Sequence, residues 1–175
     1  MAMLRSVVVC FFARREMQVS NSMPEIIADS VDAYIFRTAG QRVQFLLVQR
    51  ESDRTFGGVW QSMHTRVEQR ETTLDAARRS VREAIGLDPL AAYSVDYIHQ
   101  FFDHERDLIV FAPSLAFSLA PGGEYTLGDG FKALAWFDAE DAANRLIWAG
   151  QRSAIRTFTR ILAKGGEDIE LHRIG

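Results

Sequence analysis

The segment that most constrains the fold of this chain is residues 60–87, because it joins a short loop to a helix whose two ends are both marked. Thr72 with Asp75 three residues later is a capping-box-like pair, and Gly86 is a typical residue at the end of a helix. The apolar residues between them recur at helical spacing and form one stripe: Leu74, Ala77, Val81 and Ile85. The spacing therefore predicts an amphipathic helix over 72–85 that packs inward.

The rest of the chain predicts strands around this helix. Strands are expected at 32–36, 43–49, 94–102, 108–120 and 133–137, with turns near 39–40 and 121–123. Asp138 is expected to cap a helix over 139–147, and the periodicity predicts a final helix over 151–164. Strands that alternate with a few helices favour an α/β sandwich over an all-α or all-β protein.

The polar side of the predicted helix carries more positive than negative charge. It holds Arg78, Arg79 and Arg82 against Asp75 and Glu83. Residues four apart are neighbours on a helix surface, so Glu83 is expected to pair with Arg79. The alternative is that Glu83 binds a divalent cation, because carboxylates are hard oxygen ligands.

The whole segment resembles the Nudix box, which reads Gly, five residues, Glu, seven residues, then Arg-Glu-apolar-x-Glu-Glu-x-Gly-apolar. Aligned on Gly86 and Leu87, the chain keeps the spacing and three residues of the pattern: Glu71, Arg79 and Glu83. It departs at three positions, where Thr65 replaces Gly and Ser80 and Ala84 replace Glu. The resemblance covers nearly all of 28–163, including the strands. Within the family, this segment is most similar to pyrophosphohydrolases of the dihydroneopterin triphosphate and dATP type. It implies a Nudix fold, a mixed β-sheet between α-helices in an α/β/α sandwich.

The resemblance also implies roles for individual residues. Glu83, Arg79 and Glu71 match the catalytic positions, and Glu71 and Arg79 are expected to pair and fix the loop to the helix. Mg²⁺ or Mn²⁺ would be held by Glu83, Glu68 and Asp129. Because the loop Gly, two box carboxylates and most of a downstream acidic run are replaced, metal-dependent hydrolysis is expected to be weakened.

Other residues near the box have two interpretations each. Asp129 precedes the closing Trp136 and is either a ligand or a turn residue. His64 is either a ligand of a softer metal or a surface residue. Arg66 and Trp60 are expected to bind substrate, although aromatic residues on strands often belong to the core.

Composition narrows the class of partner. The 175-residue chain has a formal net charge of −3, which argues against a nucleic-acid polymer as ligand. The apolar run at 7–13 is too short to span a membrane. The single Cys10 excludes an internal disulfide framework and favours the cytoplasm. The expected divisions are an N-terminal extension (1–27), a Nudix domain (28–165) and a C-terminal tail (166–175).

Two functions follow from these observations. The first is pyrophosphohydrolysis of a nucleoside di- or triphosphate-type compound with Mg²⁺ or Mn²⁺. The second is a non-catalytic Nudix domain that binds a nucleotide or a protein partner through its basic edge without metal. A homodimer is compatible with either function.

Overall fold

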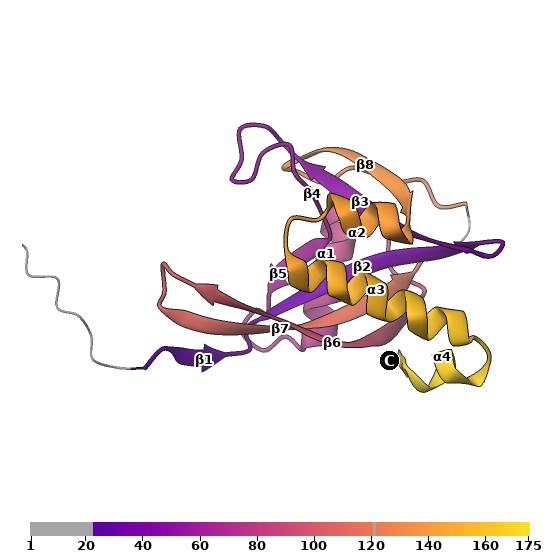
Figure 1. Cartoon of the computed structure of the whole chain (residues 1–175). Coiled ribbons are helices and arrows are strands. Elements are labelled where there is room, and N and C mark those ends of the chain that lie inside the picture. Colours follow the sequence, from indigo (N-terminus) through magenta and orange to yellow (C-terminus); the bar gives the residue numbers. More distant parts are fainter. Residues whose placement is uncertain (1–22, 121) are drawn as a thin grey trace, which may run out of the picture.

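The computed structural model describes residues 23–120 and 122–175, and the chain runs through them as a single layered unit (Figure 1). The apolar run at 7–13, Cys10 and residues 1–22 of the expected extension lie outside the described residues. The elements in chain order are β1 (Glu25–Ile27), β2 (Ser30–Ala39), β3 (Arg42–Arg50), β4 (Trp60–Gln61), β5 (Met63–Arg66), α1 (Thr73–Ile85), β6 (Ala91–Asp103), β7 (Leu108–Ser118), β8 (Phe131–Asp138), α2 (Ala139–Arg145), α3 (Ala149–Lys164), α4 (Glu167–Leu171) and β9 (Arg173–Ile174).

The strands form one mixed sheet with β2 at its centre. The main path runs β4-β3-β2-β7-β6-β9, while β8 pairs with β3, β5 pairs with β2 and β1 pairs with β7. The β2–β7 and β1–β7 pairs are parallel, and the other pairs are antiparallel. Strand β2 therefore has neighbours along both edges and is buried from Ser30 to Phe36.

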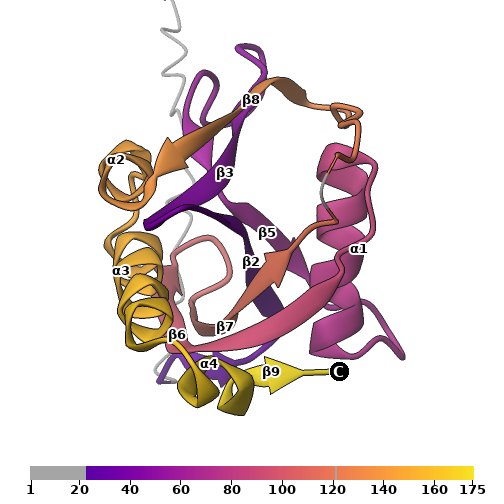
Figure 2. The same cartoon turned by 90° about the vertical axis from the view of Figure 1, so that its right-hand side faces the viewer.

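Helices cover both faces of this sheet, which confirms the expected α/β/α sandwich (Figure 2). Helix α1 packs on one face over a core that includes Val31, Leu46 and Val81. Helices α2 and α3 cover the other face, over a core that includes Tyr34, Phe45 and Phe158. No helix in the described part of the chain is long and apolar enough to cross a membrane.

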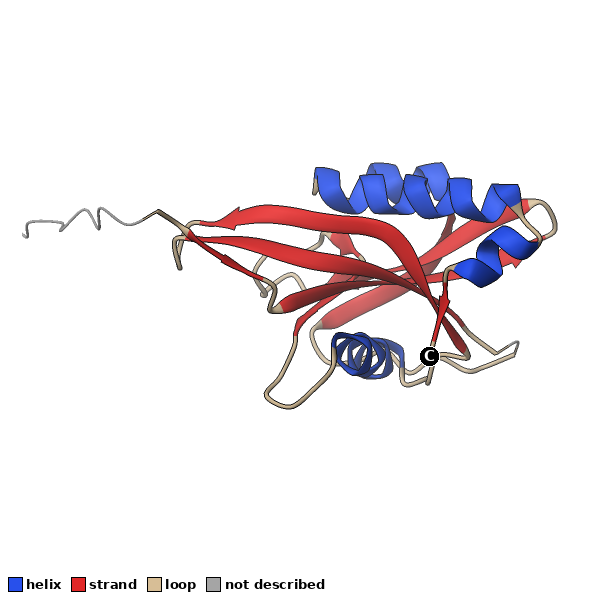
Figure 3. Ribbon diagram, turned by 90° about the horizontal axis from the view of Figure 1, so that it is seen from below, coloured by secondary structure: helices blue, strands red, loops and turns tan. Residues whose placement is uncertain are grey.

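Two segments at the margins of the sheet extend it. Strands β6 and β7 form a long hairpin that reaches beyond the helices, with β1 beside it (Figure 3). The segment 166–175, expected as a tail, forms α4 and β9, and β9 pairs with β6.

Helix α1 follows the prediction from its apolar stripe and its caps. The Thr72 hydroxyl oxygen accepts a hydrogen bond from the Asp75 backbone N–H at 3.1 Å. Gly86 ends the helix at φ 72°, in the left-handed region, and its N–H bonds to the Arg82 carbonyl. Asp138 lies at the N-cap position of α2, as expected, but its side chain makes no capping hydrogen bond and instead accepts from Gln44 at 2.9 Å.

The loop before α1 is tied to the helix by the expected Glu71–Arg79 pair. The Arg79 guanidinium donates to both carboxylate oxygens of Glu71, each at 2.9 Å, and to the Arg66 carbonyl at 3.0 Å. Bidentate geometry of this kind fixes both direction and distance. The hydrogen bonds from Arg79 lower the pKa of Glu71 to about 2.

Removing the cap of α1 should destabilise the protein. Thr72→Ala leaves the Asp75 N–H without its side-chain acceptor, which typically costs about 1 kcal/mol of unfolding free energy. Thr73→Ala is the matched control, because Thr73 begins the helix and Ala is the better helix former. Urea denaturation of both variants measures the difference, and equal losses would contradict the capping assignment.

The Glu71–Arg79 pair should make stability depend on pH in the acid range. Because the pKa of Glu71 is lowered by folding, its contribution is present at neutral pH and is lost as the pH falls toward about 2. Glu71→Gln should therefore melt below the parent protein at neutral pH, and the gap should narrow in acid.

Thermal unfolding of both proteins from neutral pH to about pH 3 tests this linkage. Glu124→Gln is the control, because Glu124 is exposed and no ion pair to it occurs within the described chain. A melting gap that stays constant across the range would show that Glu71 does not stabilise through its charge.

Candidate functional site

Two neighbouring cavities lie where the ends of three strands meet, and they share the residues at their junction. The first has a volume of about 550 Å³ and aromatic walls, and the second has about 390 Å³ and lies against α1. Arg50 at the end of β3, Gln61 on β4 and His64 on β5 line both. We call them the aromatic cavity and the box cavity.

The box cavity contains few acidic groups, and these face arginines. Glu83 on α1 lies 3.5 Å from Arg79, as the i, i+4 spacing predicts, and is 62% exposed. Asp129 in the loop before β8 lies 3.4 Å from Arg54. Glu68, outside the cavity lining, lies 3.6 Å from Arg79. Each carboxylate proposed as a metal ligand is thus already partnered by a guanidinium.

The other two positions on this edge of α1, Ser80 and Ala84, carry no carboxylate and are buried. Ser80 is buried and donates its hydroxyl to the Ala77 carbonyl at 2.8 Å, and Ala84 is buried in the core. The backbone of Gly128 packs so closely that a Cβ there would lie 1.9 Å from the Glu83 carbonyl oxygen. The two box positions at which Ser80 and Ala84 replace glutamate are thus internally bonded or apolar here.

These residues do not fit a Mg²⁺ site. A Mg²⁺ or Mn²⁺ ion needs several oxygen ligands at octahedral positions. The box cavity offers two carboxylates, each paired with an arginine. Across residues 23–120 and 122–175, no group of three or more His, Cys, Asp or Glu residues is arranged to hold a metal ion.

A different polar cluster lies at the junction, centred on Asp32 of β2. Asp32 is 0% exposed. Its Oδ1 lies 2.8 Å from His64 Nδ1, its Oδ2 lies 2.9 Å from His99 Nδ1, and Gln151 Nε2 donates to Oδ1 at 3.3 Å. Asp32 and His64 are directly opposite each other in the β2–β5 pair.

The charge state of Asp32 fixes the tautomers of its partners. Burial alone would raise the pKa of the Asp32 carboxyl, but hydrogen bonds from His64 and His99 hold it below its ordinary value. An ionised carboxylate only accepts hydrogen bonds, so each imidazole must carry its proton on Nδ1. The Nε2 atoms of both rings are then left for other partners.

The aromatic cavity combines aromatic side chains with buried polar atoms. Phe56 and Trp148 meet edge to face at 5.1 Å, and Phe101 lies opposite His99 at 5.3 Å between ring centres. Gln151 Oε1, buried in its lining, has no hydrogen-bond partner among the described residues, whereas the Ser62 hydroxyl faces that of Tyr34. Buried polar atoms are normally satisfied, so Gln151 Oε1 indicates a place for a polar ligand or water.

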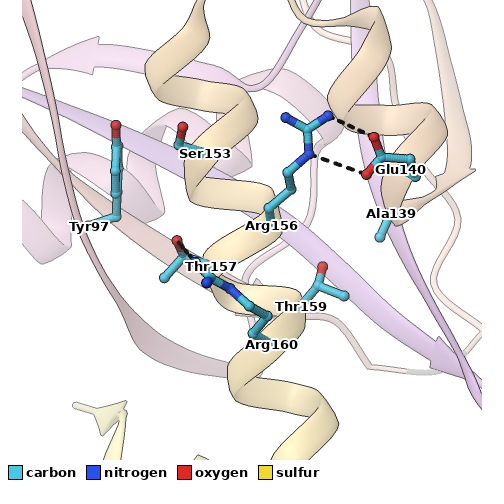
Figure 4. Close-up of a pocket in the computed structure, with 8 residues that line it drawn as sticks. All are labelled: Tyr97, Ala139, Glu140, Ser153, Arg156, Thr157, Thr159 and Arg160. Atoms are coloured by element: carbon cyan, nitrogen blue, oxygen red, sulfur yellow. Dashed lines mark hydrogen bonds and ion pairs between the residues drawn. The ribbon is translucent and has the colours of Figure 1, made fainter.

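A third hollow, of about 690 Å³, lies on the outer side of α3 and has a different character (Figure 4). Its Arg156 is held by Glu140 through hydrogen bonds of 2.7 and 3.2 Å, and Arg160 donates to Thr157. Its positive charge is thus partly neutralised, and it shares no residue with the junction.

The structure brings some of the predicted residues together and separates others. Glu71, Arg79, Glu68 and Glu83 form one group around the Arg79 guanidinium. Asp129 lies across the box cavity. Arg66 and Trp60 line neither cavity: Arg66 is exposed at the end of β5, and Trp60 packs edge to face on Phe137 at 5.0 Å.

Sequence reasoning missed Asp32, His99 and Gln151. A signal for Asp32 was present, because a carboxylate inside an apolar strand has to find partners if the strand is buried on both faces. His99 and Gln151 carried no comparable signal, since they reach Asp32 across 67 and 119 residues of chain.

Solved structures of known proteins share this fold. A NUDIX hydrolase-family protein from Listeria monocytogenes superposes with a TM-score of 0.67 and 23% identity, over 79% of this chain and 96% of that one. The Ap4A hydrolase of C. elegans gives a TM-score of 0.66 and 19% identity, over 79% and 99%. The dihydroneopterin triphosphate pyrophosphohydrolase of E. coli gives 0.61 and 24%, over 77% and 98%.

One curated relative matches by sequence. An octanoyltransferase of Myxococcus xanthus is 31% identical over 133 residues, which are 74% of this chain and 36% of that protein. The chain therefore corresponds to about a third of that longer protein. The family model of the NUDIX domain matches residues 27–158. With this match and the shared fold, the chain belongs to the NUDIX domain family, as the spacing of its box predicted.

Proposed function

We propose that this Nudix domain binds a small nucleoside di- or triphosphate-type compound at the junction of its two cavities, without a resident divalent metal. The observation that carries this proposal is the distribution of charge. The carboxylates around the box are paired with Arg79 or Arg54, whereas Arg50 at the junction has no carboxylate within 4.0 Å in the described chain. Arg50 therefore offers an anionic group at the junction a guanidinium that no described carboxylate pairs with.

The phosphate part of such a ligand would lie in the box cavity beside Arg50. Guanidinium groups bind phosphate oxygens through paired, charge-assisted hydrogen bonds. The Arg50 Nε donates only to the Thr55 carbonyl, at 3.3 Å, so most of its donors remain for a ligand. Metal ions neutralise phosphate charge in Nudix enzymes generally. In this proposal, the Arg50 guanidinium neutralises that charge instead.

The ring part of the ligand would lie in the aromatic cavity. Phe101, Phe56 and Trp148 offer apolar and π surface, and Gln151 offers an unpartnered amide oxygen. A planar heterocycle with N–H donors would pack against the aromatic side chains and donate a hydrogen bond to that oxygen. Two of the similar structures are named for compounds that join rings to phosphates, which is the same chemical type.

We infer that the metal-dependent hydrolysis of the family is lost from this chain. A cation at the box would compete with Arg79 for Glu83 and with Arg54 for Asp129. The loss of ligands and of a base each lowers the rate of such a reaction by orders of magnitude. The bidentate pair of Glu71 and Arg79 then serves the fold alone.

Ligand binding should survive removal of metal. Isothermal titration with ATP, dATP, GTP and diadenosine tetraphosphate, in Mg²⁺ and again in EDTA, should give the same affinity for any compound that binds. Arg50→Gln should weaken that affinity by about tenfold or more, because one charge-assisted contact is lost.

Arg160→Gln is the matched control, since it removes the same charge from the outer side of α3. Binding that requires Mg²⁺, or Mg²⁺-dependent turnover that Glu83→Gln abolishes, would overturn the proposal and establish a working metal site. An equal loss of affinity in both arginine variants would show a general effect of charge.

A further inference from the structure

We propose that His64, oriented by the buried Asp32, is a general base that hydrolyses the phosphate linkage of the bound compound without metal. The inference rests on the proposed function, because it needs a phosphate compound at the junction. It adds a catalytic group that lies outside the box motif, on β5 rather than on α1.

The hydrogen bond between His64 and Asp32 leaves the other ring nitrogen of His64 able to accept a proton. The 2.8 Å hydrogen bond to Asp32 uses His64 Nδ1, so the proton of the neutral ring lies on Nδ1 and the lone pair on Nε2. The buried carboxylate stabilises the imidazolium that forms when Nε2 accepts a proton. Asp32 thus acts as a positioning residue, and His64 as the group that meets the substrate.

Exposure decides which imidazole of the cluster can react. The His64 side chain is 38% exposed and lines both cavities. Its imidazole therefore lies between the proposed site for the heterocycle and the proposed site for the phosphates. His99 is buried, and the first turn of α3 covers its ring: a Cβ on Gly150 would lie 2.1 Å from His99 Cδ2. His99 therefore holds the second oxygen of Asp32 and leaves catalysis to His64.

The chemical step requires one water molecule. A water oxygen attacks a phosphorus atom of the linkage while His64 Nε2 takes a proton from that water. The bond from phosphorus to the bridging oxygen breaks, and its electron pair stays on the leaving phosphate. The imidazolium then returns its proton to the leaving phosphate or to solvent, and Arg50 offsets the negative charge that develops.

The ionisable groups around His64 define how this reaction should respond to pH. They come from every neighbouring element: Asp32 on β2, Arg50 on β3, Glu83 on α1, His99 and Asp103 on β6, His104 and Glu105 in the β6–β7 turn, and Asp129 before β8. A general base accepts the proton of water only in its unprotonated form, so the rate should depend on pH.

The test measures phosphate release in EDTA from the compounds that bind in the titrations. The parent protein should turn them over slowly. His64→Gln should lose about 100-fold or more of that rate while its dissociation constant changes little, because the lost group acts on water rather than on the ligand. His172→Gln is the matched control, since His172 lies at the end of α4 and outside both cavities.

Two further measurements separate catalysis from a structural effect. Imidazole added to the buffer should restore part of the rate of His64→Ala, which a merely structural role would not allow. Asp32→Asn should lower the rate, because the His64 ring loses the carboxylate that holds its proton on Nδ1.

The outcomes distinguish the two proposals. Binding in EDTA with no turnover by the parent protein, or turnover that His64→Gln leaves unchanged, would overturn the general-base role and leave the binding function standing. Failure of every compound to bind would overturn the binding function itself.

Discussion

The full burial of the Asp32 carboxylate is the constraint on which the functional end of this molecule depends. Asp32 lies in the central strand β2, with strands along both edges and cores on both faces. A buried charge is tolerated only if it is paired and hydrogen-bonded, and removing one partner of such a group costs roughly 3–5 kcal/mol. Asp32 therefore requires donors from elements that are distant in sequence.

That requirement organises the surrounding elements. It joins β5 through His64, β6 through His99 and the first turn of α3 through Gln151. These same elements form the walls of the aromatic cavity. The cluster thus stabilises the junction and, in the same geometry, turns one imidazole toward the place where a ligand would pass.

A second charge arrangement, centred on Arg79, distinguishes this box from a metal-binding one. In a metal-binding box, carboxylates gather along one edge of the helix to hold cations. Here Arg79 contacts Glu71, Glu68 and Glu83 together, and the neighbouring positions are a buried Ser80 and Ala84. Arg79 therefore ties the loop to α1 through Glu71 and occupies the remaining carboxylate of the box, Glu83.

Local spacing predicted those parts of the structure that depend on local contacts. The caps and apolar stripe of α1 and the Glu83–Arg79 pair lie within a few residues of one another, and the Nudix resemblance gave the Glu71–Arg79 pair and the fold. The Asp32 cluster could not be predicted in the same way, because its contacts span 32 to 119 residues and depend on strand order. Trp60 shows the same limit: its contact with Phe137 depends on strand pairing, which a single aromatic residue does not reveal.

The most direct test of this account is the protonation of the two histidines that face Asp32. Long-range ¹⁵N–¹H correlation spectra of the labelled protein, at a pH where the rings are neutral, report which nitrogen of each ring carries the proton. We expect the Nδ1–H tautomer for both His64 and His99, with an unprotonated Nε2. A proton on Nε2 of His64 would place a lone pair against the Asp32 carboxylate and would contradict the arrangement from which the site is derived.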